Sequence, residues 1–175
     1  MTHIARSTPP VFPPTEALVC VASLQHYKGH LDLIRALNRL RAEGVAPPVR
    51  LIGEGPFRGA VEEAVSDLQL SDQITLEGWM DRRSTLQAIE TASCLVLPSH
   101  TEGMPRSVLE SLALGTATYA SDVGGIPEVL SSDTMFPAGD VPALTALLRR
   151  HYVEPGRAEA VREIATAAGV RRAAL

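Results

Sequence analysis

The strongest constraint on the fold is a regular alternation of short apolar runs with segments of helical periodicity. Runs such as Leu18–Val21 and Cys94–Leu97 are apolar throughout and typical of short strands. Between them, segments such as 30–44 repeat apolar residues every three or four positions, as helices do. Because strand and helix alternate with short connections, the sequence predicts an α/β fold: a parallel sheet wrapped by helices on both faces.

The expected strands are 18–21, 49–52, 74–76, 94–97, 118–120 and 134–136. The expected helices are 30–44, one ending near residue 68, 81–91, 105–114, a short one after Gly125, 141–152 and a last one from Glu154. Open parallel sheets bind ligands beyond the carboxyl ends of their strands. Every candidate functional motif in the chain follows a strand, which favours one site at that edge.

Size, charge and composition indicate one ordinary globular domain. The chain has 175 residues, 45% of them hydrophobic and 21% charged, enough for a single core. A net charge of −4 and the lack of a basic stripe argue against nucleic acid as a partner. No segment resembles a secretory signal or is long enough to cross a bilayer, so we expect a cytoplasmic protein. Cys20 and Cys94 lie in expected strands, which favours buried thiols over a disulfide or metal pair.

Two glutamates flank the start of the expected 105–114 helix. Glu102 precedes the helix. Glu110 comes seven intervening residues after Glu102 and lies within the helix, roughly 7 Å along its axis from the first turn. The free N–H groups of the helix N-terminus between them favour a phosphate. A ligand with hydroxyls at both ends and a diphosphate in the middle would fit, and a nucleoside-diphosphate sugar is such a molecule.

This segment resembles the donor-binding half of the retaining glycosyltransferases of the group 1 type, which have the GT-B fold. The resemblance runs from about Leu18 to Asp140, with motifs in the same order and spacing, including Ser-Asp-Val-Gly-Gly-Ile-Pro-Glu from Ser121. It implies a Rossmann-like doubly wound parallel sheet, one half of a GT-B fold. It also implies transfer of a hexose-type residue from a nucleoside diphosphate to an acceptor hydroxyl, with retained configuration and with neither metal nor cofactor.

The resemblance also implies roles for individual residues. Glu102 would face the donor sugar, Glu110 would bind the ribose hydroxyls, and Lys28, the only lysine of the chain, would contact the diphosphate. Lys28 and Glu102 are therefore the expected catalytic residues. The other expected donor-binding residues are Gly53, Gly55, Trp79, Met80, Gly103, Met104, Pro105 and Arg106. No residue is an evident nucleophile or base, which suits a mechanism in which the leaving phosphate assists the acceptor.

Several of these residues have structural alternatives. Ser107 and Glu110 have the spacing of a capping box, which would make Glu110 a backbone partner only. Trp79 could be a core residue, and Lys28 a solvated surface lysine. Ser23 departs from the family pattern, because many relatives have an arginine there that shares the phosphate. Arg106 or Arg58 could replace it, and the sequence does not decide between them.

Only half of a GT-B enzyme is expected in this chain. We expect a proline-rich linker or arm over residues 1–17, the nucleotide-sugar-binding domain over 18–152, and a C-terminal helix over 153–175. Family members place an acceptor-binding domain before this one, and any peripheral membrane association would come through it. The chain is then a fragment, a subunit that needs a separate N-terminal partner, or a non-catalytic binding module. A sugar-nucleotide epimerase of the same fold is a weaker alternative.

Overall fold

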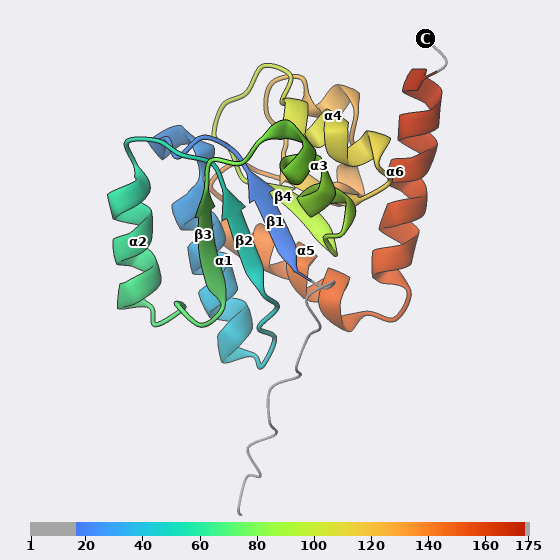
Figure 1. The fold of residues 1–175 in the computed structure, drawn as a ribbon. Helices are drawn as coiled ribbons and strands as arrows, with labels where there is room; N and C mark the ends of the chain where they lie inside the picture. Colours follow the sequence, from blue (N-terminus) through green and yellow to red (C-terminus); the bar gives the residue numbers. More distant parts are fainter. Residues whose placement is uncertain (1–16, 174–175) are drawn as a thin grey trace, which may run out of the picture.

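The computed structural model describes residues 17–173, with side chains as far as residue 167. Its six strands form one parallel sheet in the order β3-β2-β1-β4-β5-β6. The strands are β1 (Leu18–Val21), β2 (Val49–Ile52), β3 (Ile74–Gly78), β4 (Cys94–Leu97), β5 (Ala117–Ser121) and β6 (Met135–Phe136). The helices are α1 (His30–Ala42), α2 (Arg58–Asp67), α3 (Arg82–Glu90), α4 (Arg106–Ala113), α5 (Val141–Val153) and α6 (Arg157–Ala173). This is the predicted Rossmann-like α/β fold (Figure 1).

The sheet separates two hydrophobic cores because successive side chains along each strand point to opposite faces. Leu18 and Cys20 of β1 pack with α1, α2 and α5 on one face. Val19, between them, packs with α3 and α4 on the other. Both cysteines are buried and free, as predicted.

The order of the strands fixes where a ligand can bind. The chain proceeds from β1 outward through β2 to β3, then returns to the centre and places β4 on the other side of β1. The connections after β1 and β4 therefore lead to helices on opposite faces of the sheet, α1 and α4, and a crevice can form between these helices at the strand ends. Such a switch point is the usual ligand site of an open α/β sheet.

The observed elements differ from the predicted ones mainly at their ends. The last helix was expected from Glu154 but begins at Arg157. Pro155 disfavours helical geometry at the residue before it, and Glu154 is extended, with φ −77° and ψ 122°. Gly156 then adopts a left-handed conformation with φ +75°, so the chain turns before α6 can start. The expected arm over residues 1–17 lies, except for Ala17, outside the described residues.

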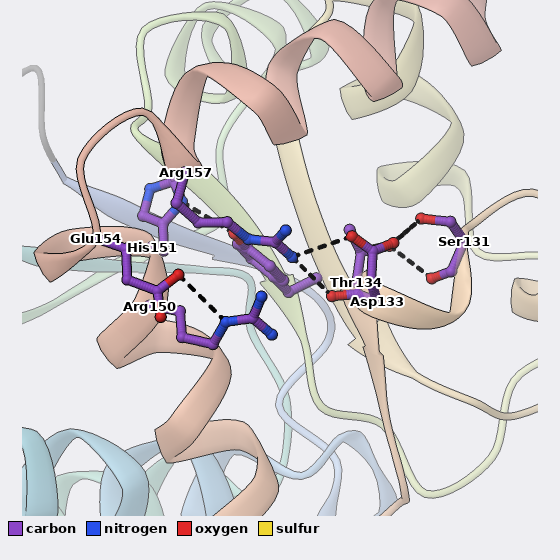
Figure 2. A network of polar contacts seen from close by, with 8 residues as sticks. Ser131, Asp133, Thr134, Arg150, His151, Glu154 and Arg157 are labelled. Carbon is purple, nitrogen blue, oxygen red and sulfur yellow. Dashed lines mark hydrogen bonds and ion pairs between the residues drawn. The ribbon is translucent and has the colours of Figure 1, made fainter.

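A polar network fastens the start of α6 to the body of the domain (Figure 2). Arg157 donates to the backbone oxygen of Asp133 at 2.9 Å and pairs with its carboxylate at 3.2 Å. Asp133 belongs to the 3-10 turn η4 (Ser132–Thr134), which leads into β6. The Arg157 side chain is only 13% exposed, so α6 is held by a partly buried ion pair as well as by apolar packing.

Candidate functional site

A cleft of about 720 Å³ opens at the carboxyl ends of the central strands, at the switch point. Its walls come from the segments that follow β1, β2, β3 and β4. It is lined by Val21, Ala22, Ser23, Lys28, Ile52, Gly53, Glu54, Trp79, Met80, Arg82, Thr85, Leu97, Glu102, Met104, Pro105, Arg106, Ser107 and Glu110. Nine residues predicted for the site are among them, and Gly55 and Gly103 are not. One crevice therefore brings together residues as distant in the chain as Lys28 and Glu110.

The centre of the cleft is an ion pair between Lys28 and Glu102. Lys28 Nζ donates to Glu102 Oε1 at 2.6 Å, and Ser99 Oγ donates to the same oxygen at 2.7 Å. The two charged side chains are 16% and 8% exposed. Lys28 is thus not a solvated surface lysine, and Glu102 is not a solvated loop acid. Both donors hold Oε1, and Glu102 Oε2 has no hydrogen-bond partner within the described part of the chain.

Close backbone packing holds the loops that carry this pair. Lys28 ends the 3-10 turn η2 (His26–Lys28), and Gly29 follows with φ +69°. A Cβ at Gly29 would lie 1.8 Å from the carbonyl oxygen of Pro98, so only glycine lets the two loops approach. The backbone N–H of His100 donates to the oxygen of Tyr27 at 2.7 Å across the same contact. The loops after β1 and β4 are therefore fastened together beside the ion pair.

The Gly124–Gly125 turn supports the Glu102 loop from its other side. Gly124 has φ +58°, and a Cβ there would lie 2.0 Å from the carbonyl oxygen of Glu102. Gly125 donates its N–H to the oxygen of Gly103 at 2.7 Å. Gly103 therefore supports the rim of the cleft through its backbone and does not line it.

Helix α4 starts one residue after Pro105, and this position excludes the capping-box alternative. Ser107 is the second residue of the helix and is buried, whereas the N-cap position belongs to Pro105, which makes no side-chain cap. The carboxylate of Glu110 instead pairs with Arg82 at 3.1 Å, from Nη1 to Oε1. Glu110 thus points across the cleft toward α3.

Two apolar residues that line the cleft, Trp79 and Met104, are exposed. Trp79 is 76% exposed, so it is not a core residue. Met104 is 38% exposed, while Met80 is half-buried and packs against the core beneath α3 and α4. An exposed indole at the cleft offers a flat surface for an aromatic ligand group.

The remaining predicted residues occupy different places. Gly53 lines the cleft, and a Cβ on it would lie 2.0 Å from the backbone oxygen of Ala22. Gly55 packs against the backbone of Leu24, away from the cleft. Of the two candidates to replace the arginine absent at Ser23, Arg58 does not line the cleft and is paired with Glu54 and Glu62. Arg106 lines the cleft and has no ion-pair partner in the described part of the chain.

Two titratable side chains near Lys28, those of His30 and Cys20, are uncharged because they are buried. His30, the first residue of α1, is 1% exposed, and burial followed by the charge of Lys28 lowers its pKa to about 4. Burial raises the pKa of the Cys20 thiol to about 12. Both groups are neutral at pH 7. The described residues contain no cluster of three or more side chains suited to a metal ion.

Arg82 and Ser99 are residues that sequence reasoning missed. Arg82 opens α3 directly after the β3 loop, where the helix dipole disfavours a cation. A cation expected at the start of a helix indicates a nearby anion, and this signal could have found Arg82. Ser99 carries no such signal, because its bond to Glu102 depends on the shape of the loop.

A parallel sheet with a switch-point cleft, in which two carboxylates are each paired with a cation, defines a Rossmann-like ligand-binding domain. Over residues 6–167 the sequence matches the profile of the family described as Glycosyl transferases group 1, and the chain belongs to that family.

Curated relatives are similar to this chain over part of their own length. The putative colanic acid biosynthesis glycosyltransferase WcaL of Salmonella typhimurium is 31% identical over 75% of this chain and 34% of its own. The amylovoran biosynthesis glycosyltransferase AmsK of Erwinia amylovora is 30% identical over 82% of this chain and 37% of its own. This chain therefore spans about a third of the length of these relatives.

Solved structures show the same fold at low identity. The pneumococcal O-GlcNAc transferase GtfA, solved with UDP and GlcNAc, superposes with a TM-score of 0.78 at 20% identity, over 89% of this chain and 32% of that one. The catalytic domain of the cholesterol-α-glucosyltransferase of Helicobacter pylori also gives 0.78 at 14% identity, over 90% of this chain and 99% of that one. The sheet is thus one Rossmann-like half of a GT-B fold. No helix in the described part of the chain is both long and apolar enough to cross a membrane.

Proposed function

We propose that this chain is the donor-binding half of a retaining glycosyltransferase and that its cleft binds a nucleoside-diphosphate sugar. The observation that carries the proposal is the ion pair of Lys28 and Glu102, which lies at the switch point with Glu110 further along α4. The family membership supports it, as do two similar structures that contain UDP: GtfA with UDP and GlcNAc, and the Anabaena protein HepE with UDP and glucose. On this proposal, residues 18–152 with the following helix form the donor domain.

The hydrogen-bonding capacity of the ion pair suits this ligand. An ammonium has three N–H donors, and Lys28 uses one on Glu102, so the others can reach a diphosphate without breaking the pair. The unoccupied Oε2 of Glu102 can accept from a sugar hydroxyl. Glu110 would accept from the ribose, and Trp79 and Met80 would face the base. Arg106, beside the N-terminus of α4, would supply the second cation that Ser23 lacks.

The proposed reaction places the acceptor on the face that the diphosphate leaves. The bond from the anomeric carbon to the phosphate oxygen breaks, a bond to the acceptor oxygen forms on the same face, and the acceptor proton moves to a leaving phosphate oxygen. Lys28 and the first turn of α4 would stabilise the negative charge that develops on the diphosphate. Preorganised donors of this kind are usually the largest contribution to such catalysis.

Binding can be tested with a thermal-shift panel of nucleoside diphosphates and their sugars. A specific ligand stabilises the native state by about 2.7 kcal/mol at a hundred times its dissociation constant. We expect at least one nucleotide to raise Tm saturably, and Glu110→Gln to reduce the effect. Arg39→Ala, an exposed change on α1 away from the cleft, is the matched control. No saturable shift with any nucleotide would contradict the proposal.

A non-catalytic nucleotide-sugar-binding module is the second candidate, because the chain spans about a third of its relatives. Both candidates would bind a nucleotide-sugar, and they differ only in whether the sugar is transferred to an acceptor. We expect no useful transfer by this chain alone, since holding donor and acceptor in register is worth roughly 7–11 kcal/mol of the barrier. Activity that appears when an N-terminal acceptor domain is added would support the half-enzyme. Continued inactivity with a domain that itself binds acceptor would favour the module.

A further inference from the structure

The ion pair between Arg82 and Glu110 has no role in the proposal above. Arg82 Nη1 lies 3.1 Å from Glu110 Oε1 and bridges the first turn of α3 to the second turn of α4. The Arg82 side chain is 71% exposed, and that of Glu110 is 21% exposed. Ion pairs this exposed contribute little to stability, with a median of about 0–1 kcal/mol. A role in folding therefore does not account for the pair.

The start of α3 determines where the guanidinium lies. Asp81 is the N-cap: its carboxylate accepts from the N–H of Ser84 at 3.0 Å and from its hydroxyl at 2.7 Å. Arg82 therefore occupies the first helical position, where the helix dipole opposes a positive charge. Arg83, the next residue, lines a neighbouring hollow to which Arg82 also contributes, but it does not line the cleft. Only one of the two arginines reaches a carboxylate of the site.

The arrangement at Glu110 resembles the one at Glu102 in its charges, although Arg82 and Glu110 form a longer and more exposed ion pair than Lys28 and Glu102. In each case a cation holds Oε1 of a cleft glutamate, through Lys28 for Glu102 and through Arg82 for Glu110. In each case Oε2 has no hydrogen-bond partner among residues 17–167. A carboxylate held at one oxygen loses rotational freedom before the ligand arrives, so less entropy is lost on binding.

We infer that Arg82 is a positioning residue: it holds Oε1 of Glu110 so that Oε2 faces the ribose, and it thereby sets a preference for ribonucleotides over 2′-deoxyribonucleotides. This inference rests on the proposed function. It assigns Arg82 no direct contact with the phosphates or the base.

The test is calorimetric titration of UDP and GDP, each with its 2′-deoxy counterpart, into wild type, Arg82→Ala, Arg82→Lys and Arg83→Ala. Arg82→Ala should weaken the ribonucleotide about two- to fivefold, as expected for an exposed charge pair, and should affect the 2′-deoxy analogue much less. Arg82→Lys should recover part of the loss. Arg83→Ala, the matched control on the same turn, should behave as wild type.

A double mutant separates positioning from direct contact. If Arg82 acts through Glu110, Arg82→Ala should cause no further loss in a Glu110→Gln background. Equal weakening of the ribo and deoxy ligands by Arg82→Ala, or a full loss in the Glu110→Gln background, would overturn the inference and leave the proposed function intact. Wild-type protein that binds neither UDP nor GDP at millimolar concentration would overturn both.

Discussion

At the scale of single residues, the cleft depends on one lysine in a chain whose other long cations are all arginine. Lys28 is largely buried. Its position is fixed by the ion pair with Glu102 and by the close backbone contact between Gly29 and Pro98. An ammonium is a compact charge with rotatable donors, so it can serve Glu102 and a phosphate together, whereas a guanidinium has a rigid fork. This accounts for a lysine at this position.

Replacement of Lys28 should affect phosphate-bearing ligands selectively. Lys28→Ala removes a charge-assisted hydrogen bond, so we expect diphosphate affinity to fall by about 1.5–3 kcal/mol. Affinity for the nucleoside without phosphates should hardly change. Calorimetry with the nucleoside diphosphate and the nucleoside measures both.

Lys28→Ala also leaves the 8% exposed Glu102 without its cation, so a control for folding is needed. The double variant Lys28→Ala with Glu102→Gln removes both charges. If the diphosphate and the nucleoside lose affinity equally in both variants, Lys28 acts on the fold and not on the phosphate.

At the scale of elements, the periodicity of the sequence was enough to predict the strands and the parallel sheet. Helix ends were less predictable where several local signals compete, as at Glu154, Pro155 and Gly156. The pairing of Arg82 with Glu110 and the exposure of Trp79 were beyond prediction, because both depend on how α3 packs beside α4. The Gly124–Gly125 motif was visible in the sequence. The structure shows why glycine is needed there: a Cβ at Gly124 would clash with the backbone oxygen of Glu102.

Substitution of Gly124 tests whether the Gly124–Gly125 turn supports the Glu102 loop. Gly124→Ala would place a Cβ 2.0 Å from the oxygen of Glu102, at a backbone φ of +58°. Gly139→Ala is a matched control, because Gly139 has φ +76° but no atom within 4 Å of the added Cβ. We expect Gly139→Ala to cost about 1 kcal/mol from backbone strain alone.

Gly124→Ala should cost more than its control and should also weaken nucleotide binding, since the Glu102 loop must move. Urea unfolding and calorimetry on both variants measure the two effects. Equal destabilisation with unchanged affinity for both would show that the contact between the turn and the Glu102 loop does not position the site.

At the scale of the whole molecule, two buried histidines connect stability to pH. His30 is the first residue of α1, and His151 on α5 is hydrogen-bonded to Ser93 at 2.6 Å and to Tyr119 at 3.1 Å (Figure 2 shows His151). Burial, followed by the charges of Arg162 and Arg157, lowers the pKa of His151 to about 4, and burial lowers that of His30 to about 4 as well.

These lowered pKa values predict a loss of stability in mild acid. Between the unfolded pKa of about 6.5 and the folded value of about 4, the unfolded chain binds more protons than the native state. The free energy of unfolding should therefore fall as pH falls through that window, by up to about 1.4 kcal/mol per pH unit for each histidine. Carboxyl groups with lowered pKa, such as Asp133 beside Ser131 and Arg157, lose their contribution only below their ordinary value of about 4.

Urea unfolding at several pH values between 7 and 4.5 checks this slope. His151→Gln removes one titrating group, so its slope should be about one proton shallower than that of wild type. A wild-type stability that is flat across this window would contradict the buried neutral histidines.

We propose that a nucleoside diphosphate binds across the switch point of the sheet. Amide chemical-shift mapping tests it most directly, during titration with the nucleotide that raises Tm most. We predict shifts in the loops after β1 and β2, at Trp79–Arg82 and over Glu102–Glu110, with little change at Ser93 near the opposite ends of the strands. Shifts that cluster away from the cleft, or none at millimolar nucleotide, would contradict the account.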